Sequence, residues 1–194
     1  MTETKTTAPF DVESWIKGAN LPTESATVYN RADVISDITA LKHRIDNVRA
    51  VDSSERTPAE KSELKKLEAE YTELLETFSN SAAAVHVRAL TQQELKDLRD
   101  KHEKAIENKT MTNKESNETF GYDLLSAAIV AVQPVGQDKH PVSLNPDQVR
   151  ALSEGIGSAQ MTAILEARQT AQNKLPAVDA DFLLRPFGVA AGQA

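Results

Sequence analysis

The chain has 194 residues, a formal net charge of −7 at pH 7 and 26% charged residues. Its length suffices for a hydrophobic core, and its composition is typical of a globular protein. The acidic balance argues against nucleic-acid binding, because phosphate recognition requires a cationic surface. The absence of cysteine excludes disulfides and thiolate metal sites, and no apolar run approaches the length of a membrane span. These features predict an acidic, mostly helical, cytosolic protein that binds neither nucleic acid nor membrane.

The segment before residue 31 is predicted to contain one short helix and one short strand. Residues 1–10 are polar and rich in threonine, as is typical of a flexible tail. Asp11 occupies an N-cap position, and Gly18 is placed to end the helix that follows. Residues 27–29 (Thr-Val-Tyr) have high strand propensity and predict the strand.

Residues 32–78 have the clearest periodicity in the chain and predict two antiparallel helices joined as a hairpin. Asp33 is placed to cap the first arm, which is predicted to continue to about Val51, and residues 52–54 predict the turn. The second arm begins at residues 57–60 (Thr-Pro-Ala-Glu), where a capping Thr precedes a Pro and an acid. Apolar residues alternate spacings of four and three in each arm, so they share one helix face. They are Val34, Ile38, Leu41, Ile45 and Val48 in the first arm, and Leu64, Leu67, Tyr71, Leu74 and Phe78 in the second.

This apolar face of each arm, which we call the seam, leaves two alternatives open. The two seams can pack against each other inside the hairpin, or they can form a groove for a partner or a second copy of the chain. Under the second alternative, the candidate partner-binding residues are Leu64, Leu67, Tyr71, Leu74 and Phe78, with the C-terminal apolar cluster Phe182, Leu183 and Leu184. The glutamate- and lysine-rich outer face of the second arm is either a solvated surface or a partner-selective one.

A second strand is predicted directly after the hairpin. Residues 80–84 are small and polar and indicate a hinge. Residues 85–90 place Val85, Val87 and Ala89 on one face, which is the alternation of a strand. We expect this strand to pair with residues 27–29, so that the hairpin is an insertion between two strands.

The next part of the chain is predicted to alternate helices with loops. Thr91 and Glu94 form a capping-box pattern that opens a helix extending to about residue 107. Residues 108–117 lack periodicity and predict a mobile loop. A mostly buried helix is predicted over residues 124–132, followed by a connector rich in proline and glycine over residues 133–141.

Two helices and a tail complete the prediction. Asn145 followed by Pro146 starts a helix that reaches Gly155, and Ser158 is predicted to cap another that runs to about Asn173. The predicted fold is mainly α with a minor β component, in which a long antiparallel helical hairpin is inserted between two short strands and followed by a small C-terminal helical bundle. The expected divisions are a flexible tail (1–10), the short helix, strand, hairpin and second strand (11–90), a helical domain (91–174) and an extended tail (175–194).

The residue pattern indicates no catalytic, metal or cofactor site. The four histidines are scattered, and His43 and Asp46 share a helix face without a third ligand. Residues 155–157 (Gly-Ile-Gly) lack the preceding strand and the third glycine of a dinucleotide-binding turn. No nucleophile elbow or Ser/His/Asp order stands out. We therefore expect a protein that is not an enzyme.

Three segments carry a resemblance to a known family. Residues 27–34 (TVYNRADV) join a strand to a charged helical stretch, and residues 85–90 (VHVRAL) precede a helix. Residues 120–128, 144–149 and 157–160 combine an apolar helix, a proline-started helix and a short capped helix. Together they resemble the tail assembly chaperones of long-tailed bacteriophages, especially phages of actinobacteria, over roughly residues 27–170. Met161 departs from the family pattern, in which many relatives have a tryptophan.

The resemblance implies a binding function in the host cytoplasm. Such chaperones coat the long tape measure protein, help bring major tail (tube) protein to it and are absent from the mature virion. An acidic helical protein can cover an amphipathic helix of its partner while adding solubility. Two other classes remain open. One is a structural virion component of the tail or connector, and the other is a helical-hairpin interaction or scaffolding protein that self-associates through its seam.

Overall fold

A computed structural model describes residues 11–51 and 57–174 of the chain. The tails predicted at residues 1–10 and 175–194, the turn at 52–54 and the cluster Phe182, Leu183 and Leu184 lie outside the described residues. The elements run in the order α1 (Val12–Lys17), β1 (Thr23–Tyr29), η1 (Ala32–Val34), α2 (Ile35–Arg49), α3 (Pro58–Asn80), β2 (Ala82–Arg88), α4 (Gln92–Glu107), α5 (Asn113–Ala128), β3 (Ile129–Pro134), β4 (His140–Pro141), α6 (Pro146–Ile156) and α7 (Ser158–Asn173).

The four strands form one antiparallel sheet in the order β1-β2-β3-β4. The predicted pairing of the strands that flank the hairpin is confirmed, with Thr27 opposite Ala84 and Tyr29 opposite Ala82. β1 begins earlier than predicted, at Thr23. β2 is displaced toward the hairpin: it includes Ala82 to Ala84, which were predicted to form a hinge, and it ends at Arg88, before the predicted end at residue 90. The prediction of a mainly α fold with a minor β component is confirmed.

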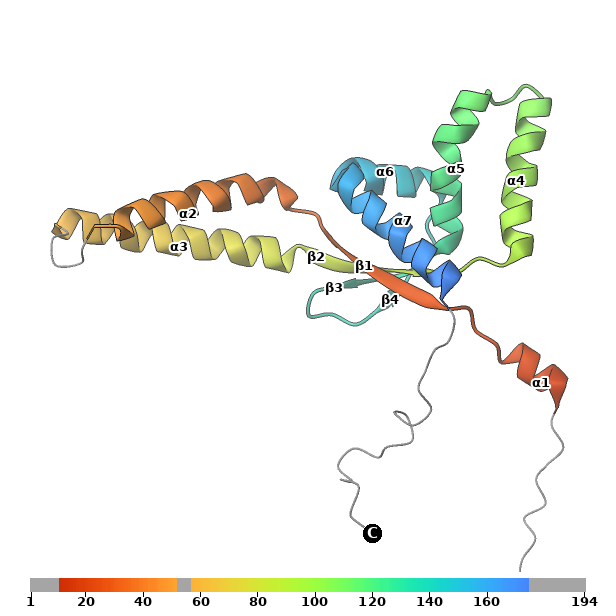
Figure 1. Cartoon of the computed structure of the whole chain (residues 1–194), viewed down its shortest axis with the longest axis horizontal. Helices are drawn as coiled ribbons and strands as arrows, with labels where there is room; N and C mark the ends of the chain where they lie inside the picture. Colours follow the sequence, from red (N-terminus) through yellow and green to blue (C-terminus); the bar gives the residue numbers. More distant parts are fainter. Residues whose placement is uncertain (1–10, 52–56, 175–194) are drawn as a thin grey trace, which may run out of the picture.

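The α2–α3 hairpin leaves the sheet between β1 and β2 and projects away from the other helices (Figure 1). Leu41, Ile45 and Leu67 form a small core of its own between the two arms. The side chain of Thr57 and that of Glu60 make the predicted capping box at the start of α3. The predicted cap at the first arm is wrong, because the carboxylate of Asp33 binds the Arg31 guanidinium and the chain enters α2 through the 3-10 turn η1.

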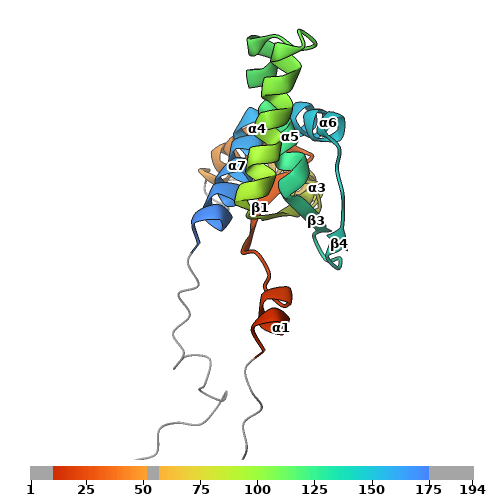
Figure 2. The ribbon, with the colours of Figure 1, turned by 90° about the vertical axis from the view of Figure 1, so that its right-hand side faces the viewer.

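The main hydrophobic core lies between one face of the sheet and the helices α5, α6 and α7 (Figure 2). Its buried residues come from both sides of position 90: Ala26, Val28, Val85, Val87, Leu125, Ile129, Val149, Met161 and Ile164. Helix α7 packs across β1 and β2, so the C-terminal helix covers the N-terminal strand. This packing makes the sheet and the three helices one structural body.

The prediction of a helix through Val132 is wrong, because α5 ends at Ala128 and the chain continues as β3. Residues 129–132 (Ile-Val-Ala-Val) are a short apolar run, which by itself does not distinguish a buried helix from a strand. The edge of β2 that faces away from β1 makes this run a strand. Val132 pairs with Val85 and Ala131 pairs with His86, so that edge accepts a third strand.

The loop predicted over residues 108–117 is also partly wrong. Thr112 caps α5, its hydroxyl accepts the N–H of Glu115, and the helix begins at Asn113. The Thr-x-x-Glu pattern was present in the sequence, but the polar composition around it concealed the helix start. At α7, Gly157 is the N-cap with a φ of 81°, so Ser158 is the first helical residue and does not cap.

Candidate functional site

The seam residues predicted to bind a partner lie between the two arms of the hairpin. Leu67 is 4% exposed and packs against Leu41 and Ile45. The partly buried residues around this contact are Val48, Leu64, Tyr71 and Leu74. This arrangement corresponds to the internal-packing alternative. It leaves the outer faces of α2 and α3 as the surface that a partner can reach.

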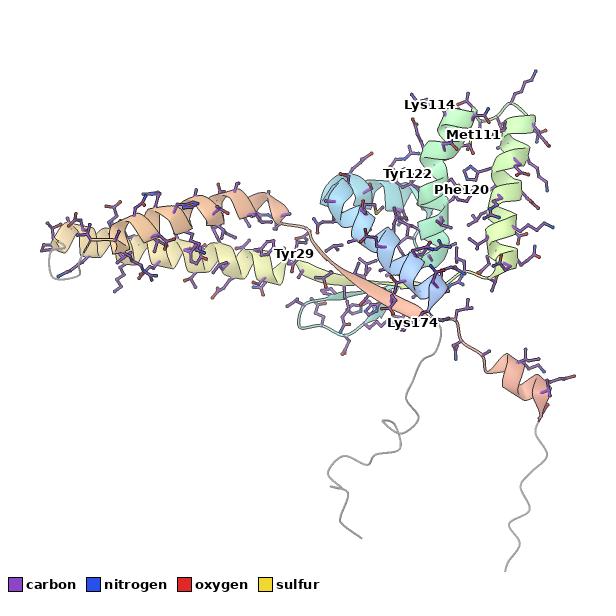
Figure 3. The ribbon with its side chains drawn as sticks, viewed as in Figure 1. Tyr29, Met111, Lys114, Phe120, Tyr122 and Lys174 are labelled. Carbon is purple, nitrogen blue, oxygen red and sulfur yellow. The ribbon has the colours of Figure 1, made fainter. Side chains whose placement is uncertain are left out.

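Phe78, the last seam residue, connects the hairpin to the body. Its ring stacks on Tyr29 with the centroids 4.3 Å apart and the planes 7° from parallel. Tyr29 lies at the hairpin end of β1 (Figure 3). The side-chain amide of Gln160 in α7 accepts the N–H of Tyr29 and donates to its carbonyl oxygen at 3.0 Å. The base of the hairpin is therefore held to the sheet and to α7.

A second group of interacting polar side chains lies between α4 and α5. His102 Nδ1 is 2.9 Å from Ser116 Oγ, and His102 Nε2 is 2.7 Å from Asp123 Oδ2. Lys101 Nζ donates to the other oxygen of Asp123 at 2.8 Å. Phe120 packs edge-on against the imidazole ring from the same side of α5 (Figure 3). We call Lys101, His102, Ser116 and Asp123 the polar cluster.

The geometry of the two helices positions the polar cluster. Ser116 and Asp123 are seven residues apart in α5, which is about two helical turns, so both side chains face α4. His102 reaches both of them from α4 and is 4% exposed. Lys101, the preceding residue, reaches Asp123 from the solvent side with a 60% exposed side chain. Polar groups thus take the place of an apolar contact between these helices.

Two opposing effects set the charge state of Asp123. Burial raises the pKa of its carboxyl group, but the hydrogen bonds from Lys101 and His102 outweigh burial and leave the pKa below its ordinary value. Asp123 is therefore an ionised acceptor at neutral pH. In the tautomer that carries its proton on Nε2, the His102 ring donates to Asp123, and Nδ1 accepts the Ser116 hydroxyl.

The Ser116–His102–Asp123 order resembles the arrangement of a nucleophilic triad, but its surroundings do not support acyl transfer. The Ser116 hydroxyl is buried in the helix interface, so a substrate has no approach to it. The backbone N–H of Ser116 binds the Thr112 carbonyl and is not free to stabilise an oxyanion. The cluster instead joins α4 to α5, which is a structural role.

The cavities lie away from the polar cluster. One of about 490 Å³ lies beside α5 and α6, where the Arg150 guanidinium is 5.4 Å from the ring centroid of Tyr122. Another of about 340 Å³ is mostly apolar and lies between the sheet and α6, beside Val28, Val85 and Leu152. The described lining of neither cavity includes a member of the polar cluster.

Within residues 11–51 and 57–174, no group of three or more His, Cys, Asp or Glu side chains is arranged to hold a metal ion. In the same residues, no helix is both long and apolar enough to span a membrane. Comparisons of the chain with protein-family models, with curated proteins and with solved structures find no significant match.

Sequence reasoning did not find the polar cluster. His102 lies within the helix predicted to extend to about residue 107, but its two partners belong to a different helix. Ser116 fell within the predicted loop, and that error hid the seven-residue spacing between Ser116 and Asp123. The available signal was the Thr112-to-Glu115 capping box, which would have placed Ser116 in the first turns of α5.

Proposed function

We propose that this chain is a tail assembly chaperone of a long-tailed bacteriophage, which binds the tape measure protein and helps to recruit tail tube subunits. The observation that carries the proposal is the α2–α3 hairpin, which projects from the sheet (Figure 1). Its seam is closed between the arms, and its outer faces are rich in charged residues. The segments that carry the family resemblance contribute to β1, β2, α5, α6 and α7, which share the main core.

The outer surface of the hairpin is suited to contact with another helix. Ion pairs between the arms, Arg44 with Glu63 and Arg49 with Glu68, lie at the surface and add little stability. Among large apolar side chains, Ile35 on α2 is 47% exposed and Leu75 on α3 is 36% exposed. An exposed apolar side chain on a helix can pack against the apolar face of an amphipathic partner helix. We assign the contact with the tape measure protein to these outer faces.

Co-expression with the tape measure protein tests the proposal. We expect the chain to keep that protein soluble and to copurify with it. Leu75→Asp should weaken the association by about 30-fold, because a charge replaces an exposed apolar anchor. Thr162→Asp, the same substitution at an exposed position of α7 outside the hairpin, is the matched control and should bind as the unchanged chain does.

Two other outcomes would replace this proposal. Absence of copurification together with stable presence in purified virions would identify a structural component of the tail or connector. Self-association through the hairpin without affinity for the tape measure protein would identify an interaction or scaffolding protein. Mass spectrometry of purified particles distinguishes a structural virion component from a chaperone. Binding assays with an isolated tape measure segment distinguish a scaffolding protein from a chaperone.

A further inference from the structure

The two edges of the sheet differ in how well they are protected against pairing with another strand. The β4 edge has two residues, His140 and Pro141, and a proline cannot donate a ladder hydrogen bond. The β1 edge has seven residues, Thr23–Tyr29, without a proline. Its one charged residue, Glu24, forms an ion pair with Lys174 at the end of α7 (Figure 3). A long edge strand without proline or an unpaired charge is available for strand addition.

The hydrogen-bond pattern identifies which residues of β1 face outward. Ala89 N–H binds the Pro22 carbonyl at 2.9 Å, and Asn30 N–H binds the Ser81 carbonyl at 3.3 Å. Because bonding alternates along an antiparallel ladder, the even-numbered residues of β1 bond to β2 and the odd-numbered residues direct N–H and C=O away from it. The outward N–H and carbonyl oxygen of Tyr29 are both bound by the side-chain amide of Gln160.

Three residues remain with outward main-chain groups: Thr23, Ser25 and Thr27. Among the described residues, none contributes a hydrogen bond to those groups. Beside them lies a groove of about 320 Å³, bounded on the other side by Ala163, Glu166, Ala167 and Thr170 of α7. Beside this groove, the outward main-chain groups of these three β1 residues have no partner in the described part of the chain. Thr23, Ser25 and Thr27 also expose their side chains on the sheet face opposite the helices.

We propose that β1 pairs with β1 of a second copy of this chain in an antiparallel ladder centred on Ser25, joining two sheets into one. The three outward residues are self-complementary under a two-fold axis. Ser25 opposes Ser25, and Thr23 of one copy opposes Thr27 of the other. This register uses all three outward positions in both copies. A register displaced toward Tyr29 is blocked because Gln160 already occupies that residue, and one displaced toward Pro22 leaves Thr27 unpaired.

The side chains favour the same register. Threonine pairs directly across an antiparallel ladder are stabilising, and the register forms two of them. Glu24 is already neutralised by Lys174 in its own copy, so no unpaired charge of β1 is brought into the ladder. The inference does not depend on the tape measure proposal, because the pairing uses the sheet edge and leaves the hairpin free.

The test is the mass of the full chain in solution, measured by light scattering and sedimentation over a concentration series. We expect a dimer. Ser25→Pro removes an outward N–H without removing a bond to β2, and should weaken the dimer about 10- to 100-fold. Circular dichroism should show that the fold is retained.

A charge complementation experiment tests the two-fold axis even if the proline variant does not fold. Ser25→Lys and Ser25→Glu each place like charges directly opposite at the axis, so each protein should be monomeric by itself. Mixing the two should restore a dimer, because the charges are then opposite. Thr72→Lys, an exposed substitution on α3, is the control and should leave the dimer unchanged.

Two results would overturn the proposal. In the first, the full chain is monomeric at every concentration. In the second, its dimer persists unchanged in Ser25→Pro, Ser25→Lys and Ser25→Glu.

Discussion

The side chain of Gln160 pairs with the main chain of Tyr29 as a neighbouring strand would. Its amide oxygen accepts the Tyr29 N–H and its amide nitrogen donates to the Tyr29 carbonyl. Gln172, twelve residues later in α7, binds the N–H and the carbonyl of Leu90 in the same way, with both distances 3.0 Å. Two glutamines of one helix therefore satisfy main-chain groups at points where the strand ladder ends, and they fix α7 over the sheet.

Removal of either glutamine amide should destabilise the fold. We expect Gln160→Ala to lower the free energy of unfolding by about 1–3 kcal/mol, because both main-chain groups of Tyr29 lose their partner. Gln172→Ala should have a similar effect at Leu90. Gln169→Ala, at an exposed position of α7, is the control and should change stability by less than about 0.5 kcal/mol. Urea denaturation measures all three, and equal effects at residues 160 and 169 would contradict the structural role.

The seam should behave as an internal core. Leu67→Ala removes a side chain that is 4% exposed and should cost about 2–4 kcal/mol. Leu67→Asp should unfold the hairpin, because it buries an unpaired charge between the arms. Leu75→Ala, on the exposed side of the same helix, should cost less than about 1 kcal/mol. Helix content from circular dichroism checks these outcomes, and retention of full helicity in Leu67→Asp would support the open-groove alternative.

Acid should destabilise the contact between β2 and α4. The hydrogen bonds from the Arg88 side chain, opposed by burial and supported by Thr91, lower the pKa of Glu94 to about 2. A carboxyl group whose pKa is lower in the folded state stabilises the fold above its unfolded pKa of about 4, and this contribution disappears as pH falls through the folded pKa. Glu94→Gln should therefore be less stable than the unchanged chain at pH 7, and the difference should vanish near pH 2.

Denaturation measured as a function of pH checks this expectation. Asp123 adds to the acid sensitivity with the same sign, because its pKa is also below its ordinary value in the folded state. Glu103→Gln, at an exposed position of α4, is the control and should follow the pH dependence of the unchanged chain. A constant difference between Glu94→Gln and the unchanged chain from pH 7 to pH 2 would exclude the Arg88 ion pair as its cause.

Arg168 is an exception to the efficient pairing of polar groups in the core. Its side chain is buried, its Nη2 donates to Gln172 at 3.2 Å, and its Nε has no partner among the described residues. Burial lowers the pKa of the guanidinium. Arg168→Met should thus raise the free energy of unfolding by about 1 kcal/mol, since it removes the cost of burying an incompletely paired charge. A loss of stability in this variant would indicate that the guanidinium has an acidic partner beyond the described residues.

The sequence determined the features of this protein that depend on near neighbours. The seam repeat predicted the hairpin. The capping patterns at Thr57 and Thr91, and Asn145 followed by Pro146, predicted helix starts that the structure confirms. These features were predictable because a helix face and a helix cap involve residues three or four positions apart.

Only the tertiary structure decided the features that depend on distant segments. Residues 129–132 are a strand because the edge of β2 accepts them, and His102 is part of a buried cluster because α5 brings Ser116 and Asp123 against α4. The open edge of β1 likewise depends on the position of α7. Gln160 of α7 binds the main chain of Tyr29 but does not reach Thr23, Ser25 and Thr27, whose main-chain groups stay open. Local pattern specifies helix caps and helix faces. The choice between helix and strand for a short apolar run, and the partner that satisfies its outward groups, are set by the packing of segments far apart in the chain.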